Sequence, residues 1–170
     1  IISLAKKKSI KIIEDAAEAL GSKSQGKNLG SFGIAGCFSF APNKILTTGQ
    51  GGMVVTNNIK LFKKLKRLKD QGREGPTTGG EDKYVSIGYN FKFTNLQSSL
   101  ALSQIKNINW RMKKLREIYK FYLKNINQNK YFRIINFDIK GGELPLWIDV
   151  WCSNRNKLFV YISKEMSYPH

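Results

Sequence analysis

The sequence is poor in the residues that build metal sites and disulfide frameworks. Its 170 residues include only two cysteines, Cys37 and Cys152, and one histidine, His170. The cysteines lie far apart, and no CxxC or Cys/His ligand spacing occurs, so neither a zinc site nor a disulfide scaffold is expected. We therefore expect no metal ligands, and this cysteine usage fits a reducing cytoplasm.

Long apolar runs are also missing. No stretch approaches the roughly 20 apolar residues that span a bilayer, so we expect no membrane partner. The opening residues 1–11, IISLAKKKSIK, lack the order of regions found in a signal peptide. The chain starts without methionine, in a pattern typical of a helix end followed by a strand. We expect it to be a fragment that lacks its N-terminal part.

Acidic residues are scarce beside basic ones. The sequence has 29 Lys and Arg against 12 Asp and Glu, a formal net charge of +17. Such a balance fits nucleic acid, an anionic membrane surface or acidic ligands. The lysines are dispersed among abundant isoleucine and asparagine, which is typical of AT-rich coding rather than of a clustered nucleic-acid footprint. We expect no nucleic-acid partner, whereas phosphate-bearing small ligands remain compatible with the charge.

The hydrophobic residues, 41% of the chain, suffice for a buried core and follow an α/β pattern. A β-branched run at residues 10–13 predicts a strand, and small residues at 16–20 predict a short helix closed by Gly21. Asp15 would then lie just past the carboxyl end of a strand, the edge where open α/β sheets bind ligands. Capping of the short helix is the alternative role for Asp15, and one side chain can do both.

A lysine lies between two further predicted strands, at residues 35–40 and 51–56. Such a lysine, Lys44, can form a Schiff base with a carbonyl compound. A carboxylate such as Asp15 against the pyridine nitrogen makes pyridoxal phosphate an electron sink, and Ser39 could offer its phosphate a hydroxyl. Many α/β proteins have a strand-end aspartate and a loop lysine. Spacing alone therefore does not decide whether Lys44 is a catalytic residue or a solvated surface charge.

Helical patterns fill much of the remaining chain. Residues 58–71 carry leucines at helical spacing between basic residues, and a helix covering a sheet is favoured over a membrane or nucleic-acid helix because the apolar stripe is narrow. Residues 72–84 form a glycine-rich connection, either a surface loop or a lid. A long helical stretch begins with a capping box of Thr94 and Gln97 and breaks near residues 106–109. Strands at 131–137 and 144–152 and a helix at 154–162 follow.

Three segments resemble the DegT/DnrJ/EryC1/StrS family of sugar aminotransferases. Residues 12–58 contain E-D-A-A, spaced glycines, F-S-F, a lysine and T-x-G-x-G-G. Residues 88–105, GYNFKFTNLQSSLALSQI, are similar to the family's G-Y-N-x-(R/K) segment and the helix after it. Residues 144–150, LPLWIDV, are similar to the start of the small C-terminal domain. The resemblance covers roughly residues 1–165.

The resemblance implies an α/β fold of the aspartate aminotransferase type (fold type I). Residues 1–105 would form the C-terminal part of the large domain, which binds pyridoxal 5'-phosphate. Residues 106–170 would form a linking helix and a truncated small α+β domain. The first half of a family member, with its Gly-Thr turn for phosphate and its ring-stacking aromatic residue, is not in this sequence.

The resemblance also implies roles for individual residues. Lys44 matches the Schiff-base lysine, Asp15 the partner of the pyridine nitrogen, and Ser39 a ligand of the cofactor phosphate. Glu18 stands near the cofactor ring, where many members have Gln or His, and Glu is typical of perosamine synthase-like members. Asn90 matches an asparagine that reaches the neighbouring subunit's cofactor, which implies a homodimer.

The implied reaction is transamination of a nucleotide-linked keto sugar, with glutamate as amino donor, in deoxyamino-sugar and polysaccharide biosynthesis. Two alternatives stay open. The chain could be a truncated, catalytically inactive family remnant. A basic nucleic-acid-binding module is the third hypothesis, and it would need clustered basic residues with stacking aromatics, whereas the aromatic residues here fall mostly at core spacing.

Overall fold

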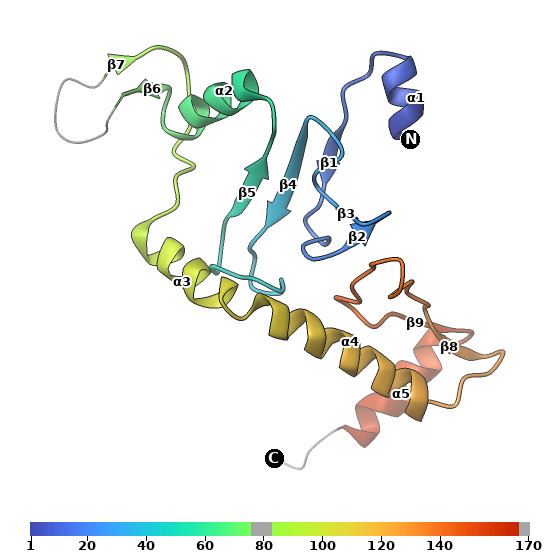
Figure 1. The fold of residues 1–170 in the computed structure, drawn as a ribbon. Helices are drawn as coiled ribbons and strands as arrows, with labels where there is room; N and C mark the ends of the chain where they lie inside the picture. The colour runs from blue at the N-terminus through green and yellow to red at the C-terminus, as the bar shows by residue number, and fades with distance from the viewer. Residues whose placement is uncertain (76–82, 167–170) are drawn as a thin grey trace.

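The computed structural model describes residues 1–75 and 83–166 and centres on a three-stranded sheet (Figure 1). Strand β1 (Ile13–Asp15) pairs in parallel with β4 (Ala35–Ser39), which pairs antiparallel with β5 (Gly52–Val55). The two strands predicted around Lys44 are confirmed, and the chain is a mixed α/β fold.

Two helices lie near the end of the sheet remote from the β4–β5 connection (Figure 1). Helix α1 (Ile2–Lys7) precedes β1, and α2 (Ile59–Lys69) follows β5. Asn58 caps α2, because its Oδ1 accepts the N–H of Leu61 at 3.0 Å. The leucines at helical spacing in α2 are Leu61, Leu65 and Leu68, and all three are half-buried. The lysines of α2 are exposed, as expected for a helix with a solvated outer face.

Helices α3 (Asn95–Ile105) and α4 (Ile108–Asn125) cross below the carboxyl end of β4 (Figure 1). The capping box is confirmed, since the Thr94 hydroxyl accepts the Gln97 N–H and the Gln97 side chain accepts the Thr94 N–H. The predicted break is confirmed too, because two residues, 106 and 107, separate α3 from α4. These helices support the loop that carries Lys44.

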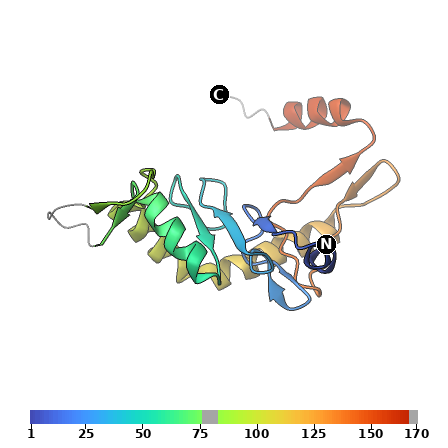
Figure 2. The ribbon, with the colours of Figure 1, turned by 90° about the horizontal axis from the view of Figure 1, so that it is seen from above.

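The remaining strands form short two-stranded ribbons, and one of them leads to the last helix. Figure 2 shows that the C-terminal ribbon and α5 project from the body formed by the sheet and the long helices. The ribbons pair β2 (Lys23–Ser24) with β3 (Lys27–Asn28), β6 (Arg73–Glu74) with β7 (Lys83–Tyr84), and β8 (Phe132–Ile134) with β9 (Val150–Cys152), before α5 (Arg155–Glu165).

The short helix predicted at residues 16–20 is wrong. The segment is a run of turns, in which the N–H of Ala19 donates to the Ala16 carbonyl and the N–H of Ser22 to the Ala19 carbonyl. A helix of so few residues does not offset the free-energy cost of helix nucleation. The run of turns ends at Gly21, whose φ of +92° lies in the left-handed region. Asp15 is the last residue of β1 rather than the residue after it.

The strand predicted at residues 144–152 is confirmed only over β9. Its first part packs instead on the turns after β1, where Leu144 is buried and Pro145 is fully buried. Proline has no N–H for a sheet ladder, which favours this packing over a longer strand. The expected division into domains at residue 105 stays a prediction.

The buried hydrophobic residues of the described chain are few and are spread over several small clusters. Phe40, directly after β4, stacks on Phe93 with ring centroids 5.9 Å apart. In the described part of the chain, no helix is both long and apolar enough to span a membrane. Residues 76–82 of the glycine-rich connection lie outside the described residues. The core comprises Ala5, Ala16, Ala35, Phe40, Leu46, Tyr119, Ile134 and Leu144.

Candidate active site

Asp15 and Ser39 lie at the carboxyl ends of two neighbouring parallel strands. Asp15 is in register with Cys37, and Ser39 follows two residues later on the same strand. Since strand side chains alternate between faces, Asp15 and Ser39 share one face of the sheet. This strand edge is where open α/β sheets bind ligands, so the structure brings two predicted site residues together.

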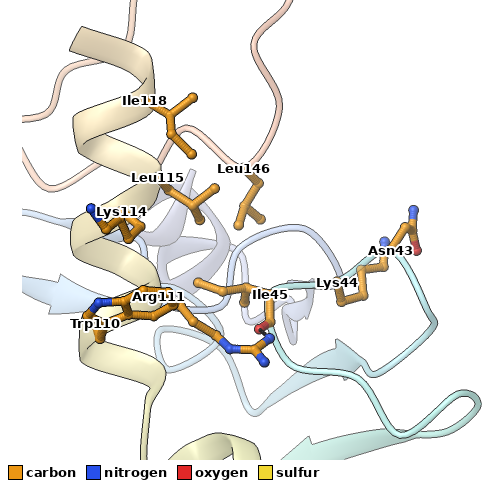
Figure 3. Close-up of a pocket in the computed structure, with 9 residues that line it drawn as sticks. All are labelled: Asn43, Lys44, Ile45, Trp110, Arg111, Lys114, Leu115, Ile118 and Leu146. Atoms are coloured by element: carbon orange, nitrogen blue, oxygen red, sulfur yellow. Dashed lines mark hydrogen bonds between the residues drawn. The ribbon is translucent and has the colours of Figure 1, made fainter. Parts of the chain in front are cut away.

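The loop that carries Lys44 is tied to α3 and α4. The Thr47 N–H donates to the side-chain carbonyl of Gln104 at 3.1 Å, and the Gln104 amide donates back to the Thr47 carbonyl at 2.6 Å. Arg111 donates to the Ile45 carbonyl at 3.0 Å (Figure 3). These bonds on both sides of one turn fix the backbone next to Lys44.

Lys44 is not a solvated surface charge. Its Nζ hydrogen-bonds and ion-pairs with Oε1 of Glu18, and its side chain is only 11% exposed. The other carboxylate oxygen of Glu18 accepts the indole N–H of Trp147 at 3.1 Å. The structure thus joins two predicted site residues directly and adds a third residue that sequence reasoning missed.

A cleft of about 350 Å³ adjoins the lysine loop on the side of α4 (Figure 3). One wall is apolar and comes from Leu115, Ile118 and Leu146, and the α4 side also carries Trp110 and Lys114. Lys114 donates to Glu117 at 2.8 Å, and this hydrogen bond lowers the pKa of the Glu117 carboxyl. The cleft combines apolar surface with cationic groups beside Lys44.

Asn90 lies apart from the other predicted residues. It is exposed, and its backbone bridges Asp70. Lys92 holds this turn through an ion pair with Asp70 at 2.7 Å, and its hydrogen bond lowers the pKa of the Asp70 carboxyl. No hydrogen bond or ion pair between described residues joins Asn90 to Lys44. Its role toward a neighbouring subunit stays a prediction.

Sequence reasoning also missed the structural use of Glu14. Its carboxylate accepts the backbone N–H groups of Gly30, Phe32 and Gly33 at 2.7, 2.5 and 2.6 Å. The loop leading to β4 is tight, since a Cβ on Gly36 would meet the Gly30 carbonyl oxygen. The sequence signal for this role was the presence of Glu14 and the spaced glycines in the family pattern. The sequence signal for Trp147 was weaker, because it was only a tryptophan in the LPLWIDV segment.

The residues present fit pyridoxal phosphate. Asp15 offers an exposed carboxylate, and Ser39 offers a hydroxyl that accepts the Ala41 N–H at 3.3 Å. Lys44 offers a shielded amine on a supported loop. A lysine amine and a carboxylate for the ring nitrogen are groups that hold this cofactor, and a hydroxyl can bind its phosphate. Among residues 1–75 and 83–166, no group of three His, Cys, Asp or Glu could hold a metal ion.

Comparison with known proteins identifies the family. The sequence pattern of the DegT/DnrJ/EryC1/StrS aminotransferase family matches residues 1–159. The chain therefore belongs to this family of enzymes, and the resemblance inferred from the sequence is confirmed.

Individual relatives agree with this assignment. The chain is 42% identical over 127 residues to a GDP-perosamine synthase from Escherichia coli O157:H7, which covers 75% of this chain and 34% of the relative. It is 38% identical over 148 residues to UDP-4-amino-4,6-dideoxy-N-acetyl-beta-L-altrosamine transaminase from Campylobacter jejuni, covering 86% of this chain and 39% of that relative. The chain thus spans under two fifths of these two relatives' length.

The structural comparison supports the expected fold. Helicobacter pylori PseC, an aminotransferase of pseudoaminic acid biosynthesis, matches with a TM-score of 0.73 at 37% identity, over 79% of this chain and 36% of that protein. The expected α/β fold of the aspartate aminotransferase type (fold type I) is confirmed for the matched part.

Proposed function

We propose that this chain belongs to a pyridoxal phosphate-dependent aminotransferase that acts on a nucleotide-linked keto sugar, with glutamate as amino donor. The shielded Lys44, held by Glu18 beside strand ends that carry Asp15 and Ser39, carries the proposal. The GDP-perosamine synthase among its relatives supports the substrate class and a role in deoxyamino-sugar synthesis for polysaccharides. The free thiols of Cys37 and Cys152 agree with a cytoplasmic location.

Each predicted residue has a task in this proposal. When bound, pyridoxal phosphate supplies an aldehyde for the lysine amine and an electron sink. Lys44 would hold the cofactor through its amine, and that amine is also the group that would accept and donate protons as a general acid and base. Asp15 would hold a proton on the ring nitrogen by charge pairing.

The remaining predicted residues would bind the cofactor or orient Lys44. Ser39 would donate its hydroxyl to the cofactor phosphate, and Asn90 would bind the phosphate of the cofactor in a neighbouring subunit, an arrangement that requires a homodimer. Glu18 orients Lys44 before reaction, because its carboxylate already contacts the amine. The cleft beside Lys44, with apolar and cationic walls, leaves room for a substrate next to the amine.

The proposal is tested by a transamination assay. The protein that contains this chain, supplied with pyridoxal phosphate, glutamate and a GDP- or UDP-linked 4-keto-6-deoxy sugar, should release 2-oxoglutarate in step with an amino sugar. Lys44→Ala should abolish this release, because the amine that links and moves protons is gone. Lys60→Ala, at an exposed lysine of α2, is the matched control and should keep full activity. Equal rates with Lys44→Ala would overturn the assignment of Lys44.

A further inference from the structure

We propose that Trp147 is a positioning residue for Lys44, acting through Glu18. The importance of Lys44 rests on the proposed function, whereas the contact between the three side chains rests on the structure alone. Trp147 lies in the segment after α4 and more than 100 residues from its partners in the sequence, so this link connects the C-terminal segment to the site.

Glu18 divides its two carboxylate oxygens between two partners. Oε1 contacts the Lys44 ammonium, and Oε2 accepts the Trp147 indole N–H at 3.1 Å. The Glu18 side chain is 51% exposed, so the Lys44 contact alone would leave it free to rotate toward water. A second hydrogen bond on the other oxygen fixes the plane of the carboxylate and thereby the place of the amine.

The indole suits this task chemically. Its N–H is a donor only and carries no charge. It therefore holds Glu18 without competing with Lys44 for the negative charge, as a second cation would. The acceptor is an ionised group, which makes this hydrogen bond stronger than one between neutral groups.

The backbone that carries Trp147 is anchored next to Glu18. The Leu144 N–H donates to the buried hydroxyl of Ser22 at 3.1 Å, and the Lys23 N–H donates to the Gly142 carbonyl at 2.9 Å. Pro145 is fully buried and has no side-chain freedom to lose. The indole is thus held on the turns that follow β1, the segment that contains Glu18.

The first test measures how reactive Lys44 is in the chain without cofactor. Amine-selective acylation followed by peptide mass spectrometry gives a rate for each lysine. We expect Trp147→Phe to raise the rate at Lys44 about two- to tenfold, the size of effect that the loss of one hydrogen bond produces. The rates at α2 lysines should not change. Trp151→Phe is the matched control, since Trp151 stacks on Arg133 and not on the Glu18 pair.

A double substitution separates positioning from mere folding. Glu18→Gln alone should also raise labelling of Lys44, and Glu18→Gln with Trp147→Phe should add nothing further, because both act on one contact. Additive effects, or an unchanged rate at Lys44 in Trp147→Phe, would overturn the proposal.

A second measurement works even if Trp147→Phe does not fold. The three tryptophans give three indole N–H signals in a ¹⁵N-labelled chain. Glu18→Ala, at a half-exposed position, should shift the Trp147 signal and leave the other two in place. An unmoved Trp147 signal contradicts the contact. Neither test contains pyridoxal phosphate. A negative result in either test would therefore overturn the role of Trp147 and leave the proposed transamination untouched, whereas a negative transamination assay would do the reverse.

Discussion

At the scale of single residues, Lys44 differs from the other basic residues in its surroundings. The net charge of +17 comes largely from exposed side chains, whereas Lys44 is 11% exposed and pairs with a carboxylate. Its neighbours Ile45 and Thr47 are held by Arg111 and Gln104. A lysine fixed in this way can present its amine in one place, which a mobile surface lysine cannot do.

Replacement of Asp15 tests the strand-end carboxylate. We expect Asp15→Asn to lower transamination by about tenfold or more, since a neutral amide does not hold a proton on the ring nitrogen. Capture of pyridoxal phosphate by Lys44 should persist, because the amine is untouched. Asp149→Asn, at an exposed carboxylate, is the control. Parallel losses of capture and turnover would show that Asp15 only supports the fold.

Residue roles were predictable from the sequence only where the family pattern states them. Lys44, Asp15 and Ser39 came from motif and spacing, and the structure places them on one sheet edge and its adjoining loop. The Glu18 contact to Lys44 spans 26 residues and depends on how the turns after β1 fold. The Trp147 contact spans 129 residues, and no periodicity or spacing reports on such a pairing.

At the scale of elements, the site depends on how the β4–β5 loop rests on α3. We expect Gln104→Ala to destabilise the chain by about 1–2 kcal/mol, because two part-buried hydrogen bonds to Thr47 are lost. Urea unfolding measures this change. Ser103→Ala, one residue earlier on the same helix and with an exposed hydroxyl, should have little effect. Equal midpoints for both variants would contradict the support role of Gln104.

The turn that carries Asn90 has its own pH dependence. The hydrogen bond from Lys92 holds the pKa of Asp70 below its ordinary value of 3.8. A lowered folded-state pKa stabilises the chain above the unfolded pKa, and this stabilisation is lost as the pH falls through the folded pKa. Lys92→Gln should therefore be less stable than the native chain at pH 7, and the gap should close below about pH 4.

The measurement for Lys92 is the urea midpoint of both chains from pH 7 down to pH 3. Lys66→Gln, on the exposed side of α2, is the control and should show no such closing gap. A gap between Lys92→Gln and the native chain that stays constant over this range would contradict an ion pair with Asp70.

Elements were predictable where local signals are strong. The capping box at Thr94 and the leucine spacing of α2 identified their helices, because each signal acts within one or two turns. The helix predicted at residues 16–20 was wrong because so few residues do not offset the cost of helix nucleation, and the chain just after them, at Ser22 and Lys23, bonds to residues 142 and 144. The same packing shortened the strand predicted at 144–152. Tertiary packing overrode local preference in this strand.

At the scale of the whole molecule, the proposed homodimer makes a quantitative prediction. If Asn90 serves the neighbouring subunit's site, a Lys44→Ala and an Asn90→Ala chain form one intact site in each mixed dimer. An equal mixture, refolded together, should recover about a quarter of native activity although each variant alone has little. Sedimentation of the mixture should show a dimer. No recovery on mixing would place Asn90 in its own subunit's site, and full activity of Asn90→Ala alone would place it outside any site.

The most direct test of the central claim is covalent capture of pyridoxal phosphate. The chain is mixed with the cofactor, reduced with borohydride, digested and mapped by mass spectrometry. We expect a single dominant pyridoxyl tag on Lys44, absent in Lys44→Ala and retained in Lys60→Ala. Tags spread over the exposed lysines, or an undiminished yield in Lys44→Ala, would contradict the claim that this shielded lysine binds the cofactor.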